Sequence, residues 1–315
     1  MTQTNIIRWF PALIYTVDKE DKYSVLKLIT KIFIFNLLLA ILATLVLGTG
    51  EEAAFFKESE IGGEAAILNL LVFLFLVILT SIGIYLLIRL KKFSLLEIIS
   101  TFLFAFISGS VASLIIPLWL YFLVIQFAII TQMEFILIEF LYIFDIVVLF
   151  IFALFFILQL LALVHIRFLK FRNTILLVTA SWAGVFLGLY SGILTPPILM
   201  LGFSLYDLYA VYKGPIKMIT SELHELDFAR KSEKEGVFVL GLGDLFFYSL
   251  ALSYSLAYLG ISAFILVTIA LILGLLITIF ILLSRSKSEG SQEVPALPIP
   301  LFLALLAIVL SNFII

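Results

Sequence analysis

The chain has 315 residues, of which 64% are apolar and only 13% are charged. Soluble domains carry about 25% charged residues, so this composition excludes an ordinary soluble domain and indicates an integral membrane protein. The chain has no cysteine, two histidines and a formal net charge of -2, which exclude disulfides and thiolate metal sites and argue against a nucleic-acid partner.

Nine apolar segments are long enough to cross a bilayer, because a spanning helix needs about 20 mostly apolar residues. The segments run near 28–48, 65–88, 93–131, 133–166, 173–193, 195–213, 237–259, 261–283 and 296–314. The predicted fold class is therefore an all-α membrane protein with nine transmembrane helices. The third segment is long for one span, and Pro117 with the run Ser108-Gly109-Ser110 predicts a break or a strong tilt in it. We expect no cleaved signal peptide, because a polar stretch precedes the first segment.

The basic residues predict how the chain is oriented in the membrane. Of the 19 Lys and Arg residues, Lys57 alone falls in an outer segment when nine spans begin with the N-terminus inside. Cytoplasmic segments carry the excess of basic residues in membrane proteins, so this partition supports both the count and the orientation. We expect a multi-pass protein of the cell membrane with a cytoplasmic N-terminus and an extracytoplasmic C-terminus.

We expect one membrane domain over residues 1–315, without a separate soluble domain. Residues 1–193 form five N-terminal scaffold helices, and residues 194–315 form helices six to nine with a cytoplasmic loop at 214–236. This loop is predicted to be either a short amphipathic interfacial helix or a solvated segment. The apolar tail Ile6–Ile14 is expected to lie at the inner membrane interface as an anchor.

Three carboxylates stand out inside predicted spans, namely Asp145, Asp207 and Asp244. Each costs roughly 2.5–3.5 kcal/mol in a bilayer even on the insertion scale, so each is a functional hypothesis. At 1.5 Å per residue, Asp207 lies about 9 Å and Asp244 about 12 Å from the inner ends of consecutive, antiparallel spans. These two acids therefore share a depth. For Asp145 we expect a structural hydrogen bond to another helix or a place in a wet cavity.

Two carboxyl groups that face each other away from bulk water cannot both ionise, so one holds a proton while the other stays charged. Such a pair hydrolyses peptide bonds in aspartic proteases, without a metal or cofactor. The zinc-protease pattern is incomplete, since His224-Glu225-Leu226-Asp227-Phe228 lacks the second histidine. Depth alone leaves open a structural role, or an ion-leak channel or proton-coupled carrier that uses the same acids.

Three short motifs discriminate between these alternatives. They are Tyr206-Asp207, Gly241-Leu242-Gly243-Asp244 and Pro295-Ala296-Leu297. This order of YD, GLGD and PAL on the last four spans resembles the presenilin and signal peptide peptidase family of intramembrane aspartyl proteases. The neighbouring Lys213-Gly214-Pro215 favours the presenilin branch. A second PAL copy, Pro11-Ala12-Leu13, is interpreted as a chance match.

The resemblance implies a presenilin-like fold and a hydrolase that cleaves transmembrane helices or signal peptides. It implies that Asp207 and Asp244 are the catalytic pair, that Tyr206, Gly241, Leu242 and Gly243 support the active site, and that Pro295, Ala296 and Leu297 support the active conformation and the substrate. The loop at 214–236 is far shorter than in animal presenilins, which leaves its autocleavage open. The compact chain is similar to microbial relatives and signal peptide peptidases, which implies a protein without obligate subunits and leaves an oligomer open.

Glycines also mark a predicted packing surface. Gly184, Gly188 and Gly192 repeat every four residues in the fifth segment, which is typical of close helix packing in membranes. Gly241 and Gly243 lack side chains, so the backbone before Asp244 is expected to approach a neighbouring helix or an extended substrate closely.

Overall fold

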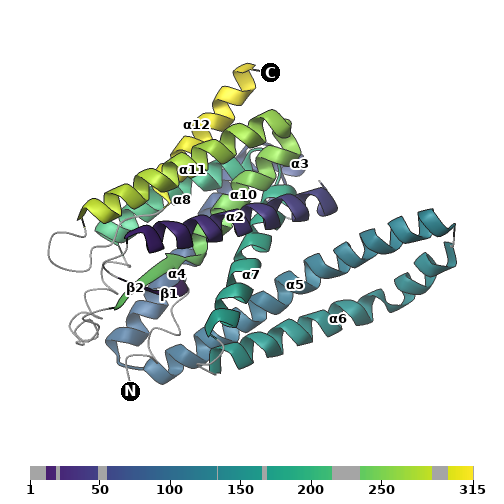
Figure 1. Ribbon diagram of the computed structural model, residues 1–315, viewed down its shortest axis with the longest axis horizontal. Coiled ribbons are helices and arrows are strands. Elements are labelled where there is room, and N and C mark those ends of the chain that lie inside the picture. The colour runs from purple at the N-terminus through teal and green to yellow at the C-terminus, as the bar shows by residue number, and fades with distance from the viewer. Residues whose placement is uncertain are drawn as a thin grey trace.

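The structure is a computed structural model that describes residues 12–18, 22–48, 55–132, 134–164, 169–214, 235–285 and 297–314. These residues are mostly helical (Figure 1). The helices are α2 (Lys22–Leu47), α3 (Glu58–Ile61), α4 (Glu64–Arg89), α5 (Phe93–Thr131), α6 (Glu134–Val164), α7 (Leu169–Tyr190), α8 (Thr195–Tyr212), α10 (Leu242–Tyr254), α11 (Gly260–Arg285) and α12 (Pro298–Ile314). A π-helical turn, η3 (Ser255–Leu259), joins α10 to α11.

Each of the nine predicted apolar segments overlaps with a helix. Within the ranges described, six helical stretches are long and apolar enough to be candidate membrane spans, and one of these, Leu242–Ile281, has 40 residues and includes both α10 and α11. The π-helical turn η3 and Gly260, whose φ is +86°, interrupt this stretch, so α10 and α11 are two separate helices. Helix α8 carries two prolines and Asp207 and is not among the six, and α12 is a shorter apolar helix. The chain is a multi-pass membrane protein, and nine crossings stay a prediction.

Helices α5 and α6 form a long antiparallel hairpin that projects away from the other helices (Figure 1). Aromatic pairs such as Phe102 with Phe156 and Phe106 with Phe152 fill the contact between them. The break predicted in the third segment is absent, because α5 is continuous over 39 residues with Pro117 inside it. A helix of this length measures about 58 Å and exceeds the bilayer thickness, so a strong tilt or a protruding end is required.

Asp145 does not make the predicted bond to another helix. Its side chain is exposed on α6, and among the residues that the structure describes no hydrogen bond or ion pair reaches it.

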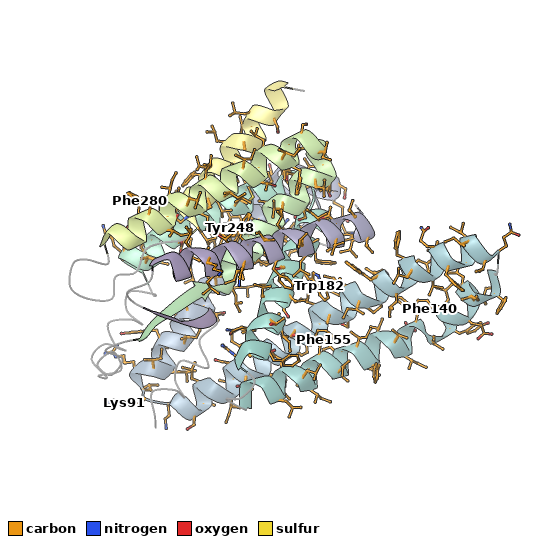
Figure 2. The ribbon with its side chains drawn as sticks, in the orientation of Figure 1. Lys91, Phe140, Phe155, Trp182, Tyr248 and Phe280 are labelled. Atoms are coloured by element: carbon orange, nitrogen blue, oxygen red, sulfur yellow. The ribbon has the colours of Figure 1, made fainter. Side chains whose placement is uncertain are left out.

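The core lies where α2, α7, α8, α10, α11 and α12 pack together. Figure 2 shows Tyr248 within this group of helices, whereas Phe140 lies near the far end of the α5–α6 hairpin. Helix α10 is buried on nearly all sides, with ten of its 13 residues buried. A helix that is apolar around its circumference belongs inside a protein, so α10 is the central helix of the core.

The glycine repeat of α7 lets α10 approach closely. A Cβ atom added at Gly184 would collide with the carbonyl oxygen of Phe246, and one at Gly188 would collide with Ser253 Oγ. Both obstacles belong to α10. The packing role predicted for Gly184 and Gly188 is therefore confirmed.

A buried polar contact links α10 to two other helices. Asn36 on α2 is fully buried, and its Oδ1 accepts hydrogen bonds from Ser181 Oγ on α7 and from Ser249 Oγ on α10, the latter at 2.8 Å. Polar side chains that bond across helices stabilise membrane bundles, so Asn36 helps to fix the depth of α10.

A small antiparallel sheet was not predicted. Strand β1 (Ala12–Asp18) pairs with β2 (Glu235–Gly241), in a register that places Ala12 opposite Gly241 and Asp18 opposite Glu235. The seventh apolar segment therefore begins as a strand, and its helix starts only at Leu242. The run Val237-Phe238-Val239 explains the difference, because β-branched and aromatic residues favour extended backbone.

The same sheet includes the end of the N-terminal tail. Ala12 and Leu13, which belong to the second PAL copy, are part of β1, and the place of the tail at the inner membrane interface stays a prediction. Residues 6–11 of that tail and residues 215–234 of the predicted cytoplasmic loop lie outside the described residues.

Candidate active site

Helices α8 and α10 bring Asp207 and Asp244 together. Asp207 is partly buried, and Asp244 is buried with 8% of its surface exposed. The two carboxyl groups interact electrostatically, and both also interact with Tyr248 of α10. The acids that were predicted to share a depth on neighbouring helices therefore belong to one site.

Asp244 is held at the start of α10. Gly241 is the N-cap residue of the helix, and its backbone forms a hydrogen bond to the Asp244 carboxyl group three residues later. This is the return bond of a capping box, in which the third helical side chain binds the N-cap N–H. A helix N-terminus also favours a negative charge. Strand β2 ends at Gly241, so it leads directly into the acid.

The two glycines of the GLGD motif have different surroundings. A Cβ atom on Gly241 would lie 3.1 Å from Asp244 Oδ2, which is tighter than an ordinary contact. A Cβ atom on Gly243 would meet nothing within 4 Å. Gly241 therefore makes room for the carboxylate, whereas Gly243 leaves open space beside it.

That open space belongs to a cavity of about 340 Å³ next to the acids. Its lining residues come from α4, α7, α8, α10 and the position just before α12, and they are Phe73, Val77, Leu187, Leu199, Phe203, Tyr206, Asp207, Gly243, Phe246, Phe247 and Leu297. Its volume is within the range of small-molecule and peptide side-chain pockets, and its walls are apolar except for one carboxylate and one phenol. The cavity suits an apolar peptide segment placed against Asp207.

The third motif also contacts the acid pair. Leu297 is buried, and its backbone N–H donates a hydrogen bond to Asp207 Oδ2 at 3.2 Å. Its carbonyl oxygen accepts from Leu301 N at 3.1 Å, which opens the hydrogen-bond ladder of α12. Pro298, the first residue of α12, has no N–H to donate. The PAL motif thus supplies a backbone donor to Asp207, while Pro295 and Ala296 lie outside the described residues.

Tyr206 and Leu242 complete the predicted site. The Tyr206 ring packs edge-to-face on Phe203 with centroids 6.3 Å apart, and its buried hydroxyl has no hydrogen-bond partner among the residues that the structure describes. Leu242 is partly buried as the first residue of α10. A buried hydroxyl without a partner requires an explanation, and here it belongs to a residue of the cavity wall.

Comparison with known proteins shows a similarity to presenilins. The Presenilin family profile matches residues 219–315, which include Asp244 and the PAL motif. The chain is also 34% identical over 118 residues to Presenilin-B of Dictyostelium discoideum. The C-terminal part of the chain is therefore similar to presenilins. The aligned part is 35% of this chain and 24% of the relative, so the match spans about a quarter of the length of that presenilin.

The presenilin profile begins after Asp207, so the geometry alone connects this residue to the matched part of the chain.

Sequence reasoning missed two structural supports of the site, Asn36 and the backbone N–H of Leu297. Asn36 gives a sequence signal, as a polar residue inside an apolar span. The Leu297 contact gives none, because any residue other than proline carries a backbone N–H. No group of three His, Asp or Glu residues that could hold a metal ion occurs in the described part of the chain.

Proposed function

We propose that this presenilin-like protein is an intramembrane aspartyl endopeptidase that hydrolyses peptide bonds within transmembrane segments or signal peptides. One observation carries the proposal. The acids of the YD and GLGD motifs, on helices α8 and α10, interact beside one apolar cavity, and Asp207 is also bonded to the PAL backbone. The similarity to presenilins supports the same conclusion.

In the proposed reaction the pair shares one proton, because two adjacent carboxylates in a dry site do not both ionise. The ionised carboxylate takes a proton from a water molecule, and the water oxygen attacks the peptide carbonyl carbon. The protonated carboxyl group donates a hydrogen bond to the carbonyl oxygen as charge develops there. The C–N bond then breaks while the amine nitrogen receives a proton, and a new carboxyl group and a new amine leave.

The proposed substrates are transmembrane helices. A helix engages its carbonyl groups in its own hydrogen bonds, so the segment to be cut has to become extended. The open space beside Gly243 and the apolar walls formed by Phe203, Phe246 and Phe247 would receive such a segment and its side chains. Cleavage is proposed for the inner half of the bilayer, in a chain with a cytoplasmic N-terminus, an extracytoplasmic C-terminus and no obligate protein subunit.

Purified protein in lipid nanodiscs, incubated with a single-span peptide, tests the proposal. Mass spectrometry should detect two complementary fragments with the parent protein and none with Asp207→Asn or Asp244→Asn. Asp145→Asn is the matched control, because it removes another intramembrane carboxylate that lies on the exposed face of α6. Equal cleavage by the parent and both active-site variants would refute the proposal, and proton or cation flux that those variants abolish would favour a channel or carrier.

A further inference from the structure

The start of α8 poses a hydrogen-bonding problem, because the first N–H groups of a helix have no partner within the helix. Pro196 and Pro197 in its first turn carry no N–H. Ile198 N–H bonds to the Leu194 carbonyl at 3.2 Å and starts the ladder. The backbone donors that require an external acceptor are therefore those of residues 193–195.

Glu58 of α3 accepts from all three. Its Oε2 lies 2.9 Å from Ile193 N, and its Oε1 lies 2.6 Å from Thr195 N and 2.7 Å from Thr195 Oγ1. Leu194 N lies 3.0 Å from Oε1 and 2.9 Å from Oε2. Hydrogen bonds to an ionised carboxylate are stronger than neutral ones, and the helix N-terminus favours the negative charge. We call this set of contacts the Glu58 cap.

The surroundings are shaped around the cap. Gly192 has φ of +91°, and a Cβ atom there would lie 2.5 Å from Glu58 Cδ. Glycine is the residue that tolerates both conditions, so the third glycine of the repeat serves this contact rather than the predicted packing of α7 on another helix. The expectation for Gly192 is corrected accordingly.

Asn69 of α4 fixes the segment that carries Glu58. Asn69 is fully buried, its Nδ2 donates to the Phe56 carbonyl at 2.8 Å and to Thr195 Oγ1 at 3.3 Å, and its Oδ1 accepts from Phe56 N at 3.0 Å. The cap is thus tied to α4 as well as to α8. Because Asn69 of α4 fixes the segment that carries Glu58, the Glu58 cap resists movement of the start of α8 along the helix axis.

We propose that Glu58 is a positioning residue that sets the height and rotation of α8 and thereby places Asp207 against Asp244. Asp207 lies twelve residues after Thr195 on the same helix, about 18 Å away at 1.5 Å per residue. The 18 residues of α8 form one continuous helix, so a displacement at its start reaches Asp207. A misplacement of about 1 Å is enough to lower a catalysed rate by about 100-fold.

Glu58→Gln tests the inference and keeps the shape of the side chain. Both oxygens of Glu58 accept hydrogen bonds from backbone N–H groups. In the glutamine variant, an NH₂ group would replace one of these oxygens and would face N–H groups that also donate. The matched control is Glu60→Gln, which makes the same charge change in α3, where Glu60 pairs only with the exposed Lys57 at 3.5 Å. The catalytic readout rests on the proposed function. With a membrane peptide, Glu58→Gln should lower kcat by at least about tenfold and change KM by less than about threefold, and Glu60→Gln should match the parent.

A distance measurement provides a readout that does not need activity. The chain has no cysteine, so spin labels at Leu205→Cys on α8 and Ile265→Cys on α11, both 53% exposed, form one unique pair. Glu58→Gln should shift or broaden the distance distribution between the labels, and Glu60→Gln should not. Thr195→Val removes the hydroxyl contacts to Glu58 and to Asn69 and keeps the backbone bonds to Glu58. It should give a smaller shift in the same direction, and it serves if Glu58→Gln does not fold.

The outcomes separate the two proposals. An unchanged distance distribution in Glu58→Gln and Thr195→Val overturns the positioning role. A shifted distribution with kcat equal to that of Glu60→Gln overturns it too, because α8 would then move without consequence for the acids. A parent protein that cleaves no membrane peptide refutes the protease, while the label distances still decide whether Glu58 positions α8.

Discussion

The close approach of α7 and α10 leads to a quantitative prediction for Gly184→Ala. The new Cβ would collide with the Phe246 carbonyl oxygen and lie 2.9 Å from the Phe246 carbonyl carbon and 3.0 Å from Ser249 Cβ. Ordinary carbon contacts are about 3.5–4.0 Å, so the α10 backbone would have to retreat by about 1 Å. Overpacking of this kind costs about 1–3 kcal/mol. Because α10 carries Asp244, the shift should also separate the acid pair.

Gly83→Ala is the matched control. Gly83 lies inside helix α4, and a Cβ atom there would meet nothing within 4 Å. Both substitutions gain the same helix propensity of about 1 kcal/mol, so the difference between them isolates the overpacking energy. We expect Gly184→Ala to have a free energy of unfolding about 1–3 kcal/mol below that of Gly83→Ala.

Reversible unfolding in mixed micelles, followed by circular dichroism, measures this difference, and cleavage of a membrane peptide measures the effect on the acids. Gly184→Ala should lose most of its cleavage rate per folded molecule, and Gly83→Ala should keep it. If the two variants unfold and cleave alike, α7 and α10 do not approach as closely as described, and the account of how Asp244 is positioned is wrong.

Three further predictions concern buried groups around the site. Asn36→Leu should lower the free energy of unfolding by about 1–2 kcal/mol. In a double-mutant cycle, its coupling energy with Ser249→Ala should be about 0.5–1.5 kcal/mol, and strict additivity would contradict the hydrogen bond between Asn36 and Ser249. Tyr206→Phe should leave the free energy of unfolding unchanged or raise it by up to about 1 kcal/mol, since its hydroxyl has no partner; a clear loss of stability would reveal one. Gly243→Ala should leave the thermal unfolding temperature unchanged but slow the cleavage of bulky substrates, because its methyl group would enter the cavity; equal loss for all substrates would contradict steric exclusion.

The helices were predictable because apolar length is a local property of the sequence. The sequence predicted that Asp207 and Asp244 share a depth, and the two acids do interact electrostatically. The residue count for Asp244, however, assumed a helix where the chain forms strand β2 up to Gly241. The packing of Gly184 and Gly188 followed from their spacing of four, although the spacing did not reveal that α10 was the partner.

The differences arise where distant segments meet. An apolar run such as Val237-Phe238-Val239 is compatible with a helix or a strand, and its pairing with β1 joins residues more than 200 positions apart, which no local pattern reveals. Glu58 is one of five glutamates between residues 51 and 64, and only the three-dimensional contact distinguishes it from Glu60. For the third segment a break or a strong tilt was predicted, and the break does not occur because α5 stays helical through Pro117.

The most direct test of the central claim is the cleavage rate constant of the double variant Asp207→Asn/Asp244→Asn under single-turnover conditions, compared with those of the two single variants. Groups that act as one catalytic unit are strongly non-additive. We therefore predict that each single variant loses at least about 1000-fold and that the double variant is no slower than either one. A double variant whose loss of rate equals the product of the two single losses would contradict a shared catalytic pair. A single variant that keeps the parent rate would contradict it as well.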